Sequence, residues 1–270
     1  MKAASGRVLI IAGSDSGGGA GIQGDIKTVT CLGGYAASAI TALTAQNTLG
    51  VQAILPIAPE FIAQQIESVM SDIGADSFKS GMLYSASVIE KVASEIRRYP
   101  NIPYVLDPVM FAKGGAALLE KGALAALKNT LIPLATIITP NIPEAEFLSG
   151  MTIGSTDDMP EAARAIQSLG CRAVLLKGGH LEGDALSDLL MDGEQMLWLK
   201  SQKRDTPHTH GTGCTLASAI ATGLAQGMPL AAAVKRAHGY VQQAITHAPQ
   251  LGTGHGPLGH GFTVGKFNGN

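Results

Sequence analysis

Residues 7–34, RVLIIAGSDSGGGAGIQGDIKTVTCLGG, join a short apolar run, a glycine-rich turn and an amphipathic run. The run 7–13 is typical of a strand. The run 22–33 has the spacing of a helix, and Gly33-Gly34 would end it. A strand followed by a glycine turn and a helix is the opening unit of an α/β fold, so this stretch predicts the fold class.

The same alternation continues through most of the 270 residues. It predicts strands at 36–47, 77–81, 104–109, 135–141 and 173–179, and helices at 59–74, 85–99, 115–131, 158–170, 212–227 and 229–248. In the helix at 59–74, Phe61, Ile62 and Ile66 recur at helical spacing and are expected to face the core.

The rhythm changes at residues 186–200, LSDLLMDGEQMLWLK, where Asp192-Gly193 separates two apolar runs. This pattern predicts a type I′ hairpin. We therefore expect one domain over residues 1–270, with a central mostly parallel sheet, helices on both faces and an antiparallel edge hairpin.

Composition narrows the class of protein. Apolar residues make up 46% of the chain and charged residues 15%, which indicates a folded protein. Nineteen Lys and Arg face 21 Asp and Glu without a long basic run, so neither nucleic acid nor a membrane surface is an expected partner. Three widely spaced cysteines and no signal-peptide core favour a reducing cytoplasm.

The first candidate site is the turn Gly13 to Gly21. Its glycines allow a ligand to approach the backbone closely. A dinucleotide-binding loop is one interpretation, but no acidic ribose ligand follows the next helix, and the Gly-Lys-Ser/Thr ending of a P-loop is absent. A small-molecule site and a plain tight turn are the alternatives. Asp25, on the helix that follows, is either a ligand for a substrate hydroxyl or amine or a solvated helix residue.

The second candidate is Gly211-Thr212-Gly213-Cys214, between a polar loop and an Ala-rich helix. A helix start presents unpaired amides and partial positive charge, which suits a transferring phosphoryl group. Cys214 in the first turn should have a lowered pKa and could accept a proton from an alcohol. The alternative is a small buried cysteine that packs the start of the helix.

Polar residues also follow three of the predicted strands. Asn141 and Glu144 could hold a hydrated Mg²⁺, or they could cap a helix that has Pro143 in its first turn. Asp107 and Lys177 each follow a buried strand. They are expected either to face the cleft above the sheet or to act as ordinary salt-bridge partners.

Seven stretches taken together resemble a known family. They are GSDSGGGAGIQGDIKT (13–28), ITALTAQNTLGVQ (40–52), KSGML (79–83), VLDPVM (105–110), TPNIPEAEFL (139–148), LLKGGH (175–180) and HTHGTGCTLASAIA (208–221). They resemble the hydroxymethylpyrimidine and phosphomethylpyrimidine kinases of thiamine biosynthesis, which belong to the ribokinase-like superfamily. The resemblance runs from about Val8 to about Ala244.

The resemblance implies a three-layer ribokinase-like fold, ATP and Mg²⁺ as co-substrates, and stepwise transfer of two phosphoryl groups to a pyrimidine alcohol. It leaves K⁺ open and implies a homodimer. By position it implies substrate contacts at Gly13, Asp25, Gln46, Met82 and Val109. It implies ATP contacts at Asp107, Asn141, Lys177, Thr209, Gly211 and Gly213. Glu144 would serve the metal, and Asn141 would do so through water. The catalytic residues it implies are Gly211, Thr212, Gly213, Cys214 and Lys177.

Three rival functions stay open at this point. A pyridoxal or pyridoxine kinase of the same superfamily is the nearest, because some relatives with the same Gly-Thr-Gly-Cys turn act on pyridoxal-type rings. A dinucleotide-dependent oxidoreductase would use the first glycine turn. A non-catalytic nucleotide-binding module is disfavoured, because four candidate residues are all present together: Asp25, Glu144, Lys177 and Cys214.

Overall fold

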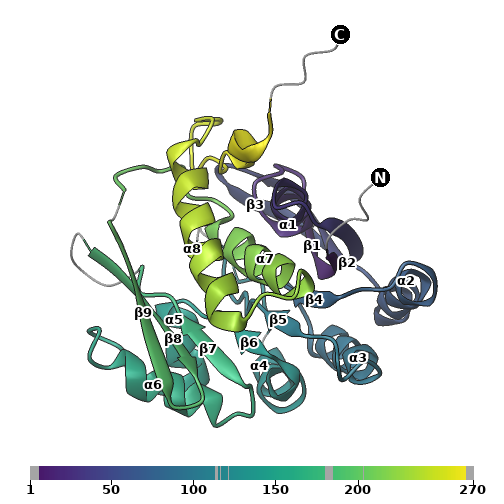
Figure 1. Cartoon of the computed structure of the whole chain (residues 1–270). Coiled ribbons are helices and arrows are strands. Elements are labelled where there is room, and N and C mark those ends of the chain that lie inside the picture. Colours follow the sequence, from purple (N-terminus) through teal and green to yellow (C-terminus); the bar gives the residue numbers. More distant parts are fainter. Residues whose placement is uncertain are drawn as a thin grey trace.

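The computed structural model describes residues 6–112, 115, 117–120, 122–179, 185–202 and 204–265. A nine-stranded sheet in the order β3-β2-β1-β4-β5-β6-β7-β8-β9 forms its centre (Figure 1). The strands are β1 (Arg7–Asp15), β2 (Tyr35–Asn47), β3 (Gly50–Pro56), β4 (Ser77–Ser80), β5 (Tyr104–Leu106), β6 (Ile137–Ile138), β7 (Ala173–Leu176), β8 (Ala185–Asp192) and β9 (Gln195–Gln202). Strands β2, β1 and β4 to β7 pair in parallel, and β3, β8 and β9 pair antiparallel at the two edges.

Helices cover both faces of the sheet. The elements are α1 (Gly21–Cys31), α2 (Pro59–Asp72), α3 (Ala86–Arg97), α4 (Ala123–Ala126), the π-turn η1 (Leu127–Leu131), the 3₁₀ turn η2 (Ile132–Leu134), α5 (Ile142–Ser149), α6 (Met159–Gln167), α7 (Thr212–Ala225), α8 (Leu230–Thr246) and the 3₁₀ turn η3 (His260–Thr263). Strand β1 shows the alternation: Leu9 and Ile11 join the core under α2, α3 and α6, and Val8 and Ile10 join the core under α1, α7 and α8. The predicted α/β class and three-layer arrangement are confirmed.

Two local predictions about helices are wrong. Phe61 is 55% exposed, whereas Ile62 and Ile66 are buried as expected. Only the second half of the predicted helix 115–131 is helical among the described residues, beginning at Ala123. Residues 117–120 instead form isolated bridges, Phe111 with Ala117 and Tyr84 with Leu119.

The edges of the sheet hold two further differences. The hairpin β8–β9 forms as predicted, but its register pairs Asp192 with Gln195, so the turn residues are Gly193 and Glu194. Gly193 has φ 61°, whereas Glu194 is not among the non-glycine residues with positive φ, so the turn is not type I′. Strand β3, antiparallel to β2, was not predicted at all.

The C-terminal segment packs against the face that carries α1 and α8. The His255 amide donates to the Thr48 carbonyl oxygen at 2.8 Å, and the His210 amide donates to the Gly256 carbonyl oxygen at 3.1 Å. His260 is buried between α1 and α8, with Nδ1 3.4 Å from the Thr28 hydroxyl and 3.3 Å from the Tyr240 hydroxyl. Residues 255–260 are therefore part of the folded unit.

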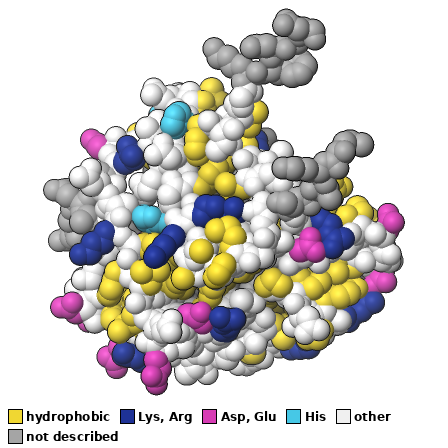
Figure 2. Space-filling view, in the orientation of Figure 1, with side chains coloured by type: hydrophobic (Ala, Val, Ile, Leu, Met, Phe, Trp, Pro, Cys, Tyr) yellow, Lys and Arg dark blue, Asp and Glu magenta, His cyan; other side chains and the backbone are white. Residues whose placement is uncertain are grey.

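The molecular face drawn in Figure 2 is not dominated by charge of one sign. Figure 2 shows Lys and Arg side chains scattered among apolar and uncharged surface, on the side where α7 and α8 lie. Among the described residues no helix combines the length and apolar character that crossing a bilayer requires.

Candidate functional site

The candidate residues lie where the parallel strands end. Asp15 ends β1, Gln46 is the penultimate residue of β2, Asp107 directly follows β5, and Lys177 directly follows β7. Because parallel strands end at the same edge, these side chains share one side of the sheet. The parallel bridge between Asn141 and Lys177 brings the ends of β6 and β7 together.

The first glycine turn is folded around a carboxylate. Asp15 accepts hydrogen bonds from the backbone amides of Gly17, Gly19 and Ala20, at 2.8, 3.1 and 2.8 Å. These amides are consequently engaged within the turn, and a diphosphate would have to displace Asp15 to reach them. This arrangement counts against the dinucleotide-loop interpretation.

His210 ties the same carboxylate to the end of β2. Its Nε2 lies 2.9 Å from Asp15 Oδ2 and 3.3 Å from Gln46 Nε2, and the Thr44 hydroxyl donates to Gln46 Oε1 at 3.1 Å. Burial alone would raise the pKa of Asp15, but His210 and the loop amides outweigh it, so the pKa lies below its usual value. Gln46 is therefore held at the end of its strand by a defined network.

A small apolar floor lies beside this network. A Cβ on Gly13 would lie 3.1 Å from the Met82 sulfur, so the glycine allows the thioether to pack against the backbone of β1. Met82 is 8% exposed and shares an apolar cluster with Val109. Three of the predicted substrate-contacting residues, Gly13, Met82 and Val109, thus form one wall.

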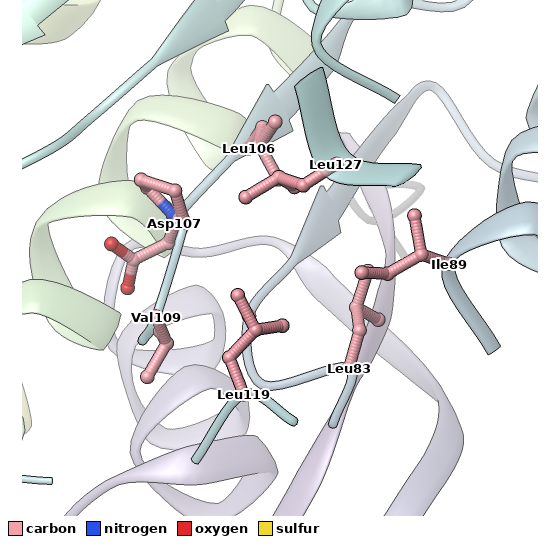
Figure 3. A pocket seen from close by; sticks show the side chains of 9 residues that line it. Leu83, Ile89, Leu106, Asp107, Val109, Leu119 and Leu127 are labelled. Atoms are coloured by element: carbon pink, nitrogen blue, oxygen red, sulfur yellow. The ribbon is translucent and has the colours of Figure 1, made fainter. Parts of the chain in front are cut away.

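A small cavity continues this wall toward the interior. It holds about 10 Å³, room for about one water, and Figure 3 shows Leu83, Leu106, Leu119 and Leu127 around it with Asp107 at one side. A larger hollow of about 460 Å³ lies elsewhere, beside Arg172, Asp192 and the turn from α7 to α8. No predicted site residue lines the larger hollow.

Asp25 is fully buried, so the expectation of a solvated helix residue is wrong. Its carboxylate accepts two hydrogen bonds from the Lys79 ammonium, at 2.9 and 2.8 Å, and one from the Ser218 hydroxyl at 2.6 Å. Direct contact between Asp25 and a substrate would need an opening above this cluster. That contact stays a prediction.

The Gly211 turn begins helix α7 as predicted. Gly211 is the N-cap with φ 89°, a conformation that favours glycine, and Thr212 is the first helical residue. A Cβ on Gly211 would collide with the carbonyl oxygen of Gly19, so the two glycine turns pack backbone against backbone. Thr209 lies half-buried just before the turn, and its carbonyl oxygen accepts from the Thr212 amide at 3.4 Å.

The predicted lowering of the Cys214 pKa is wrong. Burial raises the pKa of this thiol to about 12, and the carboxylates of Asp25 and Asp107 add to the rise, whereas the ammonium of Lys79 and the Gly21 backbone oppose it. The start of a helix favours a thiolate, but close-packed protein and two nearby carboxylates outweigh that effect here. In the free chain Cys214 is a thiol at neutral pH.

Asp107 and Lys177 meet beneath the turn. The Lys177 ammonium lies 3.6 Å from Asp107 Oδ1, and the Thr139 hydroxyl donates to the same oxygen at 3.3 Å. A Cβ on Gly213 would lie 3.4 Å from the Lys177 ammonium, so this pair abuts the helix start. Burial alone would lower the pKa of Lys177, but the Asp107 and Glu144 carboxylates outweigh it and keep the ammonium charged.

Asn141 and Glu144 cap helix α5. The Asn141 side chain accepts from the Glu144 amide at 2.9 Å, and the Glu144 carboxylate accepts from the Asn141 amide at 2.9 Å and the Met110 amide at 3.4 Å. Burial raises the pKa of Glu144 to about 7. The capping alternative is confirmed, and the metal role is untested by these contacts.

A hydrated Mg²⁺ fits this donor set better than a directly bound ion. Both Glu144 oxygens already accept backbone hydrogen bonds, so direct coordination would compete with the cap. Among the described residues no group of three or more His, Cys, Asp or Glu side chains is arranged to hold a metal. Mg²⁺ bound through nucleotide phosphates and water needs few protein ligands.

Sequence reasoning missed three residues at the site: Asp15, Lys79 and His210. Each lies inside a motif quoted from the sequence, so position alone could have flagged them. Lys79 carries a further signal, because it lies inside the predicted strand 77–81, and a lysine on a central, buried strand needs a buried partner for its charge. The partner could not be identified without the folded structure, which brings Asp25 of α1 to Lys79 of β4.

Comparisons with known proteins agree with this geometry. The family model described as phosphomethylpyrimidine kinase matches residues 15–259. The Geobacter sulfurreducens thiamine biosynthesis bifunctional protein ThiED is 54% identical over 94% of this chain, which spans 52% of that relative. The hydroxymethylpyrimidine/phosphomethylpyrimidine kinase of Streptomyces coelicolor is 48% identical over 96% of each chain. A structure of Bacillus subtilis pyridoxal kinase with ADP has a TM-score of 0.87, is 38% identical and covers 95% of this chain and 97% of its own.

Proposed function

The chain belongs to the phosphomethylpyrimidine kinase family, and from that premise we propose that it phosphorylates a hydroxymethylpyrimidine with ATP. It would phosphorylate 4-amino-5-hydroxymethyl-2-methylpyrimidine and then its monophosphate, as in thiamine biosynthesis. The observation that carries the proposal is the contact between the two glycine turns. It supports the proposal because it joins the start of α7 to the turn that follows Gly13, and Gly13 packs against Met82 of the apolar wall.

The chemistry is an in-line attack of the alcohol oxygen on the γ-phosphorus of ATP. Amides at Thr212, Gly213 and Cys214 at the helix start would donate to the transferring oxygens, and the Lys177 ammonium would balance their charge. Most of the rate enhancement then comes from positioning and electrostatics. Cys214, once ionised, would accept the alcohol proton.

Mg²⁺ would be held by the nucleotide phosphates and by water, with Glu144 and Asn141 as the nearest protein groups. When bound it neutralises charge on the β- and γ-phosphates. Asp107 would keep Lys177 oriented, and Thr209 would border the nucleotide on the loop before α7. K⁺ is a further cation to test.

Pyridoxal is the second candidate substrate, because the similar Bacillus subtilis structure is a pyridoxal kinase. Hydroxymethylpyrimidine is favoured because the Streptomyces coelicolor relative with that name is 48% identical to this chain, against 38% for the pyridoxal kinase. Gln46 supports the choice, since its amide offers both donors and acceptors to the edge of an aminopyrimidine.

We also propose one kinase domain over residues 1–270, a homodimer and a cytoplasmic location. Leu43 and Leu55 face each other across β2 and β3 and are 40% and 61% exposed, which suits an interface at this edge. Cys31, Cys171 and Cys214 are all unpaired, which suits a reducing compartment. Light scattering of the purified chain tests the dimer.

The deciding assay mixes the chain with Mg²⁺, ATP and each alcohol, and follows products by phosphorus NMR. The mono- and then the diphosphate of the pyrimidine should form, with kcat/KM above that for pyridoxal. A parallel mixture of the chain with NAD(P)H and the same candidate substrates tests the oxidoreductase, and an unchanged NAD(P)H absorbance there would count against it. If no phosphorylated alcohol forms in the presence of ATP, the proposal is contradicted. A higher kcat/KM for pyridoxal than for the pyrimidine would favour the second candidate.

A further inference from the structure

Lys79 is a buried cation to which the mechanism above gives no role. It lies on β4, its side chain is 0% exposed, and its ammonium donates to both oxygens of Asp25, at 2.9 and 2.8 Å. An ammonium has three N–H donors. The third has no hydrogen-bond partner among the described residues, so one donor is left over at the centre of the cluster.

Stability alone is a poor reason for this pair. Removing two charges from water is expensive, and apolar residues of similar volume are often as stabilising as a buried ion pair. Ser218 adds a hydrogen bond of 2.6 Å to the same carboxylate, so three elements, β4, α1 and α7, converge on Asp25. The buried network of Asp25, Lys79 and Ser218 is therefore more consistent with a functional role than with a role in stability alone.

The network lies beneath the start of α7. Cys214 precedes Ser218 by one helical turn, so both side chains lie on the same side of the helix. The charged groups that act on the sulfur come from four elements: Lys79 on β4, Asp25 on α1, Asp107 after β5 and Lys177 after β7. Lys79 has the largest charge effect on the thiol, and it favours the thiolate.

We propose that Lys79 is a positioning residue for phosphoryl transfer, which holds Asp25 under the helix start and supplies the positive charge that lets Cys214 ionise. The inference rests on the proposed function. The Cys214 thiolate takes the proton of the alcohol as the bond from that oxygen to the γ-phosphorus forms and the bond from phosphorus to the ADP oxygen breaks. Lys79 keeps its own protons and acts only on the fraction of thiolate.

The size of the effect follows from the charge. A neighbouring charge shifts a pKa by about 1–3 units, and below the pKa each unit changes the thiolate fraction about tenfold. Loss of the ammonium should therefore slow any reaction of the thiolate by about tenfold or more. A residue that only maintains the fold would instead expose the sulfur when removed, and alkylation would become faster.

The test measures alkylation of Cys214 by iodoacetamide, resolved by peptide mass spectrometry, at several pH values around pH 9. Iodoacetamide is uncharged, so its approach does not depend on local charge. Lys79→Gln keeps an N–H donor for Asp25 but removes the charge, and Lys79→Arg restores the charge. Lys235→Gln, on the exposed side of α8, is the matched control, and Cys31 in the same sample is the internal reference.

In folded Lys79→Gln, alkylation of Cys214 and kcat should both fall by about tenfold or more, and the limb on which kcat rises with pH should move to higher pH. Lys79→Arg should recover most of the loss, and the affinity for ATP should change little. Unchanged or faster alkylation in folded Lys79→Gln would overturn the inference. The proposed function fails separately, if the wild-type chain transfers no phosphoryl group at all.

A second variant covers the case in which Lys79→Gln does not fold. Lys79→Met combined with Asp25→Asn removes both charges and leaves no buried ion unpaired. Because the ammonium acts on the sulfur more strongly than the Asp25 carboxylate does, alkylation should still be slower than in the wild type. Alkylation as fast as in the wild type, or faster, would again overturn the inference.

Discussion

Acid should weaken the fold through His260, the buried histidine of the C-terminal segment. Its side chain is 5% exposed, and its Nε2 has no hydrogen-bond partner among the described residues. Burial, helped by the charge of Lys27, lowers the pKa of His260 from 6.5 to about 4. The folded chain therefore disfavours the protonated ring that an unfolded chain would accept.

The sign and size follow from this difference. Above pH 6.5 the His260 ring is neutral in both the folded and the unfolded chain, so it does not lower the free energy of unfolding. As the pH falls toward about 4, the unfolded chain binds the proton first, and the free energy of unfolding decreases. At about 1.4 kcal/mol for each unit, the loss approaches about 3 kcal/mol. That is a large part of the ~5–15 kcal/mol that stabilises a typical protein.

The assay is urea unfolding of the wild type and of His260→Phe at about pH 7 and about pH 4.5. Phe keeps a ring beside Tyr240 but cannot titrate, so the variant should lose less stability on acidification than the wild type. His247→Gln, at an exposed ring stacked on Phe262, should keep the wild-type pH dependence. Identical pH dependence in wild type and His260→Phe would refute the reasoning.

Three further changes test the site. Cys214→Ala should lower kcat by about 10²–10⁴-fold with ATP affinity nearly intact, whereas Cys31→Ala should not; a change under about threefold in kcat would remove the base assignment. Gly211→Ala should lower both kcat and Tm more than Gly227→Ala at the other end of α7, since both have positive φ but only the first meets the Gly19 backbone; equal effects would contradict the contact. Asn141→Ala should cost about 1 kcal/mol of unfolding free energy and raise the KM for Mg·ATP, whereas the N-cap variant Ser85→Ala should change stability alone.

Pattern was enough to predict most of the strands and helices in order, though not β3, because buried parallel strands and amphipathic helices have distinct periods. Pattern was not enough where the structure depends on contacts with residues that are distant in the sequence. The exposed Phe61 lies in the same apolar repeat as the buried Ile62, and only the packing of α2 distinguishes them. The turn at Gly193 depends on register, which a dipeptide does not determine.

At the site, pattern predicted the start of α7 and the polar residues beside the carboxyl ends of β5, β6 and β7, although it extended these strands too far. It did not predict the electrostatics. The pKa of Cys214 depends on Asp25, Asp107 and Lys79, which come from separate strands and helices and meet only in the folded chain. A rule based on the helix start alone therefore predicts the wrong direction. The same limit hid the pairing of Asp25 with Lys79, since 54 residues separate them.

The contact between Gly19 and Gly211 involves only backbone, so it is independent of the side chains proposed to recognise the substrate ring. It joins main chain to main chain, so the spacing between the proposed alcohol site and the proposed phosphoryl site should not depend on which side chains line the alcohol site. If Gln46, Met82 and Val109 contact the substrate ring as proposed, we expect that they can be replaced to accept a different ring without changing the distance over which the phosphoryl group is transferred. A designer seeking new alcohols should vary those three positions and leave both glycines untouched.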